Sequence, residues 1–437
     1  MPAVPPQADP RPEPCPGAGP RPDARREPCP GARRRTPRRR AYAAVALLAL
    51  SLAALAALCL AQPNVLVDVL VYRAEGRAVL DGTDLYGFTV TEWELPATYP
   101  PFAALLFVPT AWPPLPVVQA LFAAGNAVLL AWLVHLSLRL AGRRAGPAAL
   151  VTATALGVWL EPVFQTFVFG QINLALACLV LWDLTRPDGA RGKGLAIGVA
   201  AGIKLTPAIF AVYLLLTGRV RAGLTALAGF AGTAAVGAAV LPGASADFWT
   251  RRLFETGRVG KAWIVDNQSL QGLAARLLHT PEPGPWWAVP AAAAGLLGLW
   301  LARRAHARGQ AAWGVLITAG TALLVSPISW SHHWVWCVPL LAVLAASRRR
   351  WPVYAVAAVF TARTLWLVPH SGDLDLHLPW WQQPLASPYP LLALALTGYA
   401  ARRLRGGRRP APVQTSAPAP APAPPGGRER EREGERP

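Results

Sequence analysis

The stretch from Asp68 to Phe102 holds the residues best suited to chemistry. Its carboxylates stand among aromatic side chains and are Asp68, Glu75, Asp81, Asp84, Glu92 and Glu94. Asp68 follows the first strongly apolar segment closely, so it is expected near a membrane surface, where a lipid-borne substrate presents its headgroup. A carboxylate held there could act as a general base. The other interpretation is a solvated loop carboxylate without a catalytic role.

A second polar cluster, SPISWSHHWVW at Ser326–Trp336, stands at the entrance to an apolar segment. Indole rings suit the membrane interface, and imidazoles can donate hydrogen bonds to phosphate. The cluster is therefore a candidate site for a phosphate or a lipid headgroup. An aromatic belt with two interfacial histidines is the alternative, and composition does not separate the two.

Lys204 interrupts an apolar segment. A lysine there is costly unless it faces a cavity or a partner, or snorkels to the interface. The sequence alone favours neither a functional nor a snorkelling lysine.

The elements that must position these residues are membrane helices. The chain has 437 residues, of which 53% are hydrophobic and 15% charged, with a mean hydropathy of +0.32. Repeated apolar runs near the length needed to cross a bilayer indicate a polytopic membrane protein. The net charge of +19 lies mostly in the tails and short loops, as the positive-inside rule expects, which disfavours nucleic-acid binding. The five cysteines show neither metal-ligand spacing nor a disulfide framework.

Arginine clusters set the expected orientation, with the first span at Ala41–Ala61 and its N-terminus in the cytoplasm. Further crossings are expected at Pro116–Leu138, Pro147–Phe167, Ile172–Leu184, Ala222–Leu241, Trp286–Ala302, Ala311–Val325, His333–Ala346, Val353–Val368 and Tyr389–Arg402. Pro100–Pro113 is too short to span and is expected to be interfacial or re-entrant.

Gly194–Leu216 has basic residues on both sides, so a single crossing would put every later basic loop on the wrong face. We expect a broken hairpin there, because Gly202 and Pro207 permit a break. Counting its arms as two crossings, the chain has about twelve, with both termini inside. The expected domains are a disordered Pro- and Arg-rich tail over 1–40, a membrane domain over 41–405 and a disordered tail over 406–437.

This topology gathers polar segments on the outer face. They are the stretch that begins at Asp68, the turn Gly170–Asn173, the loop Pro242–Pro285, the cluster Ser326–His333 and the loop Pro369–Pro388. Asp373 and Asp375 have the spacing of a metal-binding pair, but they lie in the last outer loop. The active site is therefore expected on the extracytoplasmic face of the cell membrane.

Five segments, taken together, resemble glycosyltransferase family 87. They are YPPFAALLFVP (Tyr99–Pro109), GQINLALACLVLWDL (Gly170–Leu184), GIKLTPAIFAVYLLLTGR (Gly202–Arg219), NQSLQGL (Asn267–Leu273) and SPISWSHHWVW (Ser326–Trp336). The resemblance covers most of residues 41–405, without the tails. The family contains actinobacterial polyprenol-phosphate-mannose-dependent α-1,2-mannosyltransferases that act on phosphatidylinositol mannosides and lipoglycans. Membership implies an all-α C-type glycosyltransferase bundle with an enlarged first extracytoplasmic loop.

The resemblance also assigns residues. The acidic position of the first loop falls on Asp68, the histidine pair on His332 and His333, and the lysine of the KLTP block on Lys204. Ser331 stands where the family often has an acidic or small polar residue before the pair. Because the first loop has no clear DxD motif, we expect no cofactor and do not expect a divalent metal.

Sugar transfer from a polyprenyl monophosphate needs a base for the acceptor hydroxyl and cationic or hydrogen-bonding groups for the departing phosphate. Asp68 is the expected base, acting with inversion at the anomeric carbon. His332 or His333, with Lys204 or Arg252, would stabilise the phosphate. The other expected substrate-binding residues are Tyr99, Gln171, Asn267, Gln268 and Trp330.

The expected function is thus transfer of a hexose, mannose by the resemblance, from a polyprenyl-phosphate donor to a glycolipid or lipoglycan through an α-1,2 linkage. An arabinosyl or glucosyl donor is not excluded by the residues. The alternative is a polytopic transporter or lipid flippase, which would be expected to show inverted repeats that this sequence lacks.

Overall fold

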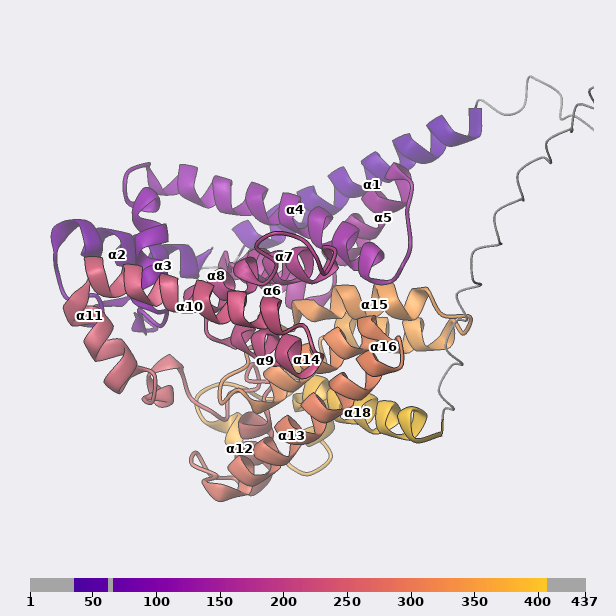
Figure 1. Ribbon diagram of the computed structural model, residues 1–437. Coiled ribbons are helices and arrows are strands. Elements are labelled where there is room, and N and C mark those ends of the chain that lie inside the picture. Colours follow the sequence, from indigo (N-terminus) through magenta and orange to yellow (C-terminus); the bar gives the residue numbers. More distant parts are fainter. Residues whose placement is uncertain (1–34, 62–65, 407–437) are drawn as a thin grey trace, which may run out of the picture.

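The computed structural model describes residues 35–61 and 66–406, and these form an assembly of α-helices (Figure 1). The described strands are β1 (Thr89–Val90) and β2 (Leu95–Pro96), paired antiparallel with Thr89 opposite Pro96. The expected all-α class is therefore confirmed. Most of the two expected tails lies outside the described residues.

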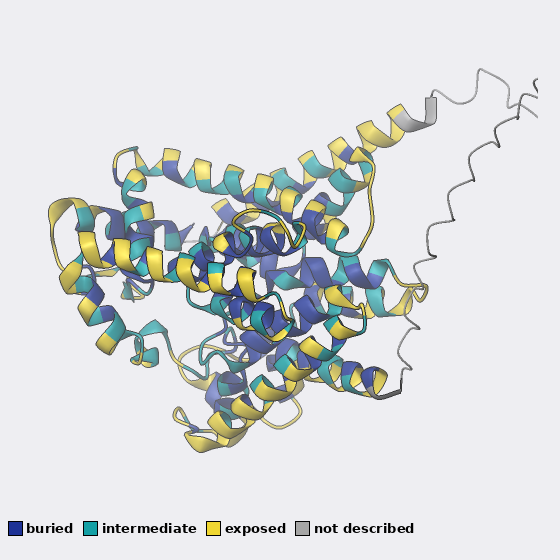
Figure 2. Ribbon diagram, viewed as in Figure 1, coloured by how far each residue is buried: buried dark blue, intermediate teal, exposed yellow. Residues whose placement is uncertain are grey.

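Four helices are long and apolar enough to cross a membrane: α1 (Arg35–Leu60), α4 (Leu115–Leu140), α10 (Val220–Val240) and α13 (Pro285–Ala307). At 1.5 Å per residue each exceeds the roughly 30 Å of a bilayer core. Large apolar side chains on them stay exposed, such as Leu50, Val128 and Leu296. Figure 2 shows these outer faces against a buried centre. Such faces suit lipid rather than water.

The segment expected as one span at Pro147–Phe167 is broken. It forms α5 (Pro147–Gly157) and α6 (Glu161–Phe169), bent by 74° to each other. Pro162 stands in the first turn of α6, where its ring disfavours continuation of the preceding helix. The expected crossing was not predicted to be broken, and the bend places Glu161 inside the molecule.

The expected hairpin at Gly194–Leu216 is present. It consists of α8 (Leu195–Ile203), the 3-10 turn η2 (Thr206–Ala208) and α9 (Ile209–Leu216). Gly194 touches Ala222 at the start of α10, and Gly202 touches Thr233 further along it. The chain then returns, because Leu215 touches Gly223 near the start of α10 again.

Each arm of this hairpin is too short to cross a bilayer, because α8 rises only about 14 Å. The same holds for several expected spans that are short helices in the structure, namely α7 (Asn173–Thr185), α14 (Ala311–Val325), α15 (Cys337–Ala345) and α16 (Trp351–Thr361). Among the described residues, four helices could span a membrane, or five if α5 and α6 count as one span. The expectation of about twelve crossings is not confirmed.

The stretch from Asp68, expected as an extracytoplasmic loop, is partly helical. It begins with α2 (Val67–Asp81), and the short segment before α4 is α3 (Pro101–Phe107) followed by η1 (Val108–Ala111). Val67, Val69 and Val71 near the start of α2 are buried, because this helix packs inward rather than lying in solvent.

The remaining helices lie in the C-terminal half. They are α11 (Pro242–Asp247), η3 (Phe248–Arg252), η4 (Thr256–Val259), α12 (Leu270–Leu278), η5 (Ser331–Trp336), η6 (Thr364–Trp366), η7 (Leu374–His377), α17 (Gln383–Ala386) and α18 (Pro388–Gly406). The largest apolar core joins α4, α6, α7, α14 and α15, and it includes Leu133, Phe167 and Leu181. The candidate site lies where this core meets α2 and η5.

Candidate active site

The junction between α6 and α2 sets the position of Asp68. The Leu66 N–H donates to Val168 O at 2.9 Å, just before Asp68 in the first turn of α2. Gly170 ends α6 with φ of 76°, and a Cβ there would lie 2.5 Å from the Val69 side chain. Only glycine combines this backbone with this close approach. The junction thereby brings Gln171 against Asp68.

Gln171 connects Asp68 to two tyrosines. Its Nε2 donates to Asp68 Oδ2 at 2.7 Å, and its Oε1 accepts from the hydroxyls of Tyr72 and Tyr99, each at 3.2 Å. Because Oε1 receives two hydroxyl donors, the amide nitrogen is the atom that faces the carboxylate. Gln171 and Tyr99 were expected to contact substrate, and the structure places both beside the expected base.

Lys204 lies at the tip of the hairpin, where α8 ends in an extended backbone. Its Nζ donates to Asn173 Oδ1 at 3.2 Å and lies 2.8 Å from His333 Nε2. A protonated lysine only donates, so His333 Nε2 accepts and the ring proton resides on Nδ1. Lys204 also lies 5.4 Å from the centre of the Tyr99 ring. The lysine therefore faces partners and not lipid.

The backbone of His332 is hydrogen-bonded, whereas, within the part of the chain that the structure describes, the nitrogens of its ring are not. Its carbonyl oxygen accepts from Asn173 Nδ2 at 3.2 Å, while the ring packs edge-on against Phe169 and His333. The side chain is 3% exposed, and neither ring nitrogen has a hydrogen-bond partner among the described residues. Buried polar groups are normally satisfied, so this imidazole is a candidate ligand-binding group.

Asn173 completes the set, because its Nδ2 also lies 3.5 Å from Gln171 Oε1. Hydrogen bonds therefore run from Asp68 through Gln171, Asn173 and Lys204 to His333. We call these five residues the polar set. They come from α2, the α6–α7 turn, the hairpin tip and η5.

Three of the expected substrate contacts have structural partners instead. Asn267 and Gln268 are fully buried, and their amides bond to backbone groups, including Pro327 O and Ala386 O. Trp330 pairs with Asn267 in a β-bridge and covers Gly260, where a Cβ would lie 2.7 Å from the indole. These residues hold the loop before α12 against the segment before η5.

Arg252 lies apart from the polar set. Its Nε donates to Asp247 Oδ2 at 2.7 Å, its Nη1 lies 3.5 Å from Glu255 Oε2, and its guanidinium lies over the Tyr86 ring. Two carboxylates therefore already neutralise this arginine. A direct contact between Arg252 and the leaving phosphate stays a prediction.

The surroundings of Asp68 suit a base. Burial raises the pKa of Asp68 to about 6, while the hydrogen bond from Gln171 and the charge of Lys204 oppose the rise. The charge of Asp266 adds to the rise, and burial also raises the pKa of Asp266. A carboxylate with this pKa is ionised at neutral pH yet basic enough to take a proton.

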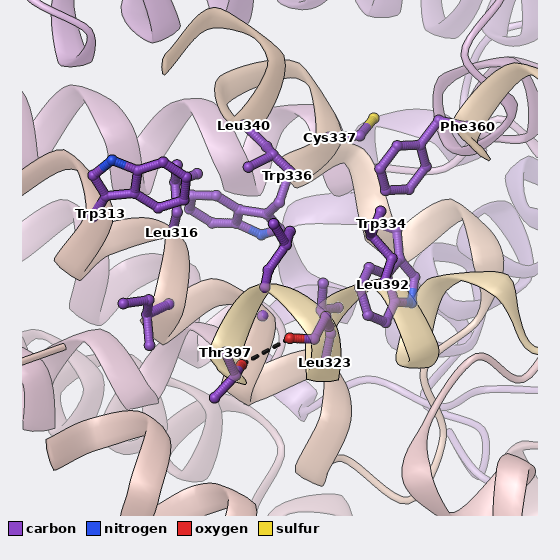
Figure 3. Close-up of a pocket in the computed structure, with 14 residues that line it drawn as sticks. Trp313, Leu316, Leu323, Trp334, Trp336, Cys337, Leu340, Phe360, Leu392 and Thr397 are labelled. Atoms are coloured by element: carbon purple, nitrogen blue, oxygen red, sulfur yellow. Dashed lines mark hydrogen bonds between the residues drawn. The ribbon is translucent and has the colours of Figure 1, made fainter. Parts of the chain in front are cut away.

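Two adjoining cavities lie beyond the polar set. One, of about 50 Å³, has Lys204 and His333 at its polar part and continues past Phe210 to Trp336. The other, of about 60 Å³, is enclosed by α14, η5, α15, α16 and α18, and Figure 3 shows its apolar walls. Leu323 and Trp336 line both cavities. Two adjoining apolar spaces therefore share a wall, and the first of them reaches Lys204 and His333.

The two aspartates with metal-like spacing face different partners. Asp373 Oδ1 accepts from Lys261 Nζ at 3.1 Å, whereas Asp375 Oδ2 accepts from the Val265 N–H at 3.0 Å. Within residues 35–61 and 66–406 no group of three His, Cys, Asp or Glu side chains could hold a metal ion.

Sequence reasoning missed Tyr72 and the buried Glu161. Tyr72 lies one turn after Asp68 on the same face of α2, and this spacing was hidden because the stretch was expected to be a loop. Glu161 accepts hydrogen bonds from Ser331, Trp366 and Tyr389. A carboxylate inside an apolar run was the available signal.

Known proteins are similar in sequence to most of this chain. Residues 97–327 match glycosyltransferase family 87. A polyprenol-phosphate-mannose-dependent alpha-(1-2)-phosphatidylinositol mannoside mannosyltransferase of Mycobacterium tuberculosis (strain ATCC 25618 / H37Rv) is 35% identical over 386 residues, covering 79% of this chain and 89% of the relative. The enzyme with the same name from Mycolicibacterium smegmatis is 35% identical over 365 residues, covering 76% of this chain and 82% of the relative.

A third relative, a polyprenol-phosphate-mannose-dependent alpha-(1-2)-phosphatidylinositol pentamannoside mannosyltransferase of Mycobacterium tuberculosis (strain CDC 1551 / Oshkosh), is 35% identical over 392 residues, covering 84% of this chain and 88% of the relative. No solved structure matches the chain significantly. With a family match over more than half its length and relatives aligned over most of it, the chain belongs to glycosyltransferase family 87 and is a membrane glycosyltransferase.

Proposed function

We propose that this glycosyltransferase transfers mannose from a polyprenyl-phosphate donor to a phosphatidylinositol mannoside or a related glycolipid, forming an α-1,2 linkage. The relatives' names support the donor, the acceptor class and the linkage. The observation that carries the proposal is the polar set: one carboxylate, one lysine and one imidazole are joined through Gln171 and Asn173 by hydrogen bonds, beside a largely apolar cavity.

The donor phosphate is proposed to lie at Lys204 and His333. Lys204 supplies a charge, and His333 donates a hydrogen bond to a phosphate oxygen through Nε2 once this atom is released from the lysine and carries the ring proton. The prenyl chain would follow the apolar walls past Phe210 and Trp336, whose rings stack at 5.2 Å. This arrangement keeps the phosphate in a site of restricted water, where charge stabilisation is strongest.

The chemical step follows from these positions. The acceptor hydroxyl oxygen forms a bond to the anomeric carbon while the bond from that carbon to the phosphate oxygen breaks. Asp68 takes the hydroxyl proton, and the prenyl phosphate leaves with the bonding electron pair. One displacement inverts the anomeric carbon, so a β-linked donor gives an α-linked product. Gln171 keeps the carboxylate oriented throughout.

The site is proposed to open on the extracytoplasmic face of a multi-pass protein in the cell membrane. The arginines at the start of α1 favour a cytoplasmic N-terminus, and Asp68 follows the other end of this helix. A donor carried on a prenyl chain would reach Asp68 from the lipid.

A donor screen on the purified protein tests the function. Labelled mannosyl, glucosyl and arabinosyl polyprenyl phosphates are each incubated with phosphatidylinositol mannosides, and product linkage is assigned by NMR. We expect the mannosyl donor to give an α-1,2-linked product. Transfer only from another sugar, or no transfer from any of the three donors, would overturn the proposal.

A further inference from the structure

A carboxylate and an imidazole lie near the polar set and have no role in the proposed transfer step. Asp266 and His332 lie on either side of Ser331, one in the loop before α12 and the other in η5. Their side chains are an acceptor and a possible donor, fixed to one short peptide. The structure explains how each is held but gives neither a full set of partners.

Asp266 is held by Ser331. Its Oδ1 accepts from the Ser331 N–H at 3.0 Å, and the neighbouring chain is aligned by the hydrogen bond from Gln268 N to Ser329 O at 2.8 Å. A β-bridge joins Asn267 to Trp330 in the same register. The Ser331 side chain also interacts with this carboxylate. Ser331 therefore fixes the carboxylate, whose two oxygens can still accept from a further donor.

Ser331 is clamped from its other side. Its hydroxyl donates to Glu161 Oε1 at 2.8 Å, and Glu161 also accepts from Trp366 Nε1 at 3.0 Å and from the Tyr389 hydroxyl at 2.5 Å. These bonds come from three distant segments and satisfy a fully buried carboxylate. Ser331, which bonds to Asp266 and directly precedes His332, is consequently held from both sides.

His332 supplies the second observation. Its side chain is 3% exposed, and both ring nitrogens lack a partner within the described part of the chain. The Thr166 and Asn173 side chains bond only to its carbonyl oxygen, at 3.5 and 3.2 Å. A buried imidazole fixed by its backbone, with its ring unsatisfied, is prepared for a ligand.

We propose that Asp266 and His332 bind hydroxyl groups of the transferred hexose and thereby select the sugar. This inference rests on the proposed function, since it names the sugar end of the same site. A hexose presents neighbouring hydroxyls that both donate and accept. A carboxylate oxygen accepts from one hydroxyl and an imidazole N–H donates to its neighbour, so the pair is complementary to a diol.

The position of Asp266 relative to the base agrees with this role. The negative charge of Asp266 acts on Asp68 as well as on its own surroundings. Lys204 acts on the same carboxylate with the opposite sign. Asp266 therefore lies in the electrostatic neighbourhood of the base and the lysine, and a sugar held by Asp266 is proposed to lie between the base and the phosphate group.

The test combines one variant with a series of deoxy donors. Asp266→Asn keeps an oxygen for the Ser331 N–H, so it preserves the structural bond and removes the charged acceptor. The values of kcat/KM are measured for wild type and variant with mannosyl polyprenyl phosphate and with its 2-, 3-, 4- and 6-deoxy forms. Asp373→Asn, an exposed carboxylate paired with Lys261, is the matched control.

We expect Asp266→Asn to lower kcat/KM for the full donor roughly 10- to 100-fold, the size of a lost charged hydrogen bond. Removing the hydroxyl at one or two neighbouring positions of the mannosyl group should lower kcat/KM of wild type by a similar factor. The same removal should lower kcat/KM of Asp266→Asn by less than about twofold. A purely structural role would leave the deoxy penalties unchanged. The proposal would be overturned if the effects of the substitution and of the missing hydroxyl on kcat/KM multiply at every position. Asp373→Asn should have the kcat/KM of wild type with every donor.

His332→Gln provides an independent arm, because an amide keeps a donor in a smaller and differently placed group. For His332→Gln, the donor that lacks a hydroxyl next to the one assigned to Asp266 should show a smaller loss of kcat/KM than it does with wild type. If Asp266→Asn does not fold, this arm decides, and multiplicative effects at every position contradict the proposal. Failure of the proposed function is distinct, since wild type would then transfer no mannose from the full donor.

Discussion

The side chains of the polar set tune one another across short distances. Burial raises the pKa of Asp68, and both Gln171 and Lys204 lower it. Lys204 also holds His333 in the tautomer that accepts from it. The chemistry proposed for each residue therefore depends on its neighbours, and the single-residue effects will not simply add.

Replacing Gln171 with methionine should move the pH dependence. The hydrogen bond from Gln171 lowers the pKa of Asp68, so its loss raises that pKa above about 6. The base must be ionised to act, and the acid limb of kcat/KM should shift to higher pH in Gln171→Met. Rates measured from pH 4.5 to pH 8.5 check this. An unmoved limb, or one shifted to lower pH, would contradict the assignment.

His333→Ala should lower kcat by about 10²- to 10³-fold with a smaller change in KM, because the imidazole is proposed to stabilise charge that develops on the leaving phosphate. Steady-state kinetics with the mannosyl donor give both constants. His377→Ala, an imidazole on the last outer segment that stacks on His279, is the control and should leave both unchanged. Equal losses in the two variants would return the histidine pair to the role of an aromatic belt.

Sequence alone made Asp68, Lys204 and the histidine pair candidates, because charged and imidazole groups stand out in an apolar chain. It could not identify Tyr72, since a tyrosine near a membrane surface is common and its hydrogen bond crosses to a residue far along the chain. Asn267 and Gln268 were also candidates from the sequence. Polar residues on an expected outer loop suggested substrate contacts, but tertiary packing gives both amides backbone partners.

At the scale of the elements, breaks in apolar segments create the site. The bend before α6 carries Glu161 inward, the turn after α6 delivers Gln171, and the hairpin tip delivers Lys204. Non-helical backbone at membrane depth is tolerated where protein surrounds it. The basic flanks predicted the hairpin, because charge is readable in sequence. The bend at Pro162 was missed, because the surrounding residues form an otherwise continuous apolar run.

Gly170→Ala should damage the site by moving an element. The left-handed backbone costs a residue with a side chain about 1–2 kcal/mol, and contact with Val69 adds to this. We expect a lower thermal midpoint in detergent and a loss of transfer. Gly125→Ala is the control, because a Cβ at Gly125 in α4 meets no atom within 4 Å. A Gly170→Ala protein with the midpoint and activity of wild type would contradict the junction described.

At the scale of the whole molecule, four long apolar helices surround a buried centre made largely of shorter ones. Composition predicted a helical membrane protein, and helix positions such as Ala311–Val325 were predicted to the residue. The expected number of crossings is not confirmed. Hydropathy does not distinguish a span from a short helix buried by its neighbours. The residues of a membrane span are apolar because they face lipid, and those of a short buried helix are apolar because they face protein.

Cysteine labelling in intact cells tests the proposed orientation. In a chain with Cys15→Ser and Cys29→Ser, Trp93→Cys places a thiol in the exposed segment that follows Asp68, and Gly189→Cys places one in a basic loop. A membrane-impermeant maleimide should label the first position in whole cells and the second only after lysis. The opposite pattern would place the proposed site on the cytoplasmic face.

The central claim is that the Asp68 carboxylate is the base for sugar transfer, and the rate of Asp68→Asn tests it most directly. With the purified protein and the mannosyl donor, we predict that transfer falls by about 10²- to 10⁴-fold while the thermal midpoint stays near that of wild type. Asp81→Asn, an exposed carboxylate at the end of the same helix, should keep full activity. Turnover by Asp68→Asn at the wild-type rate would contradict the account.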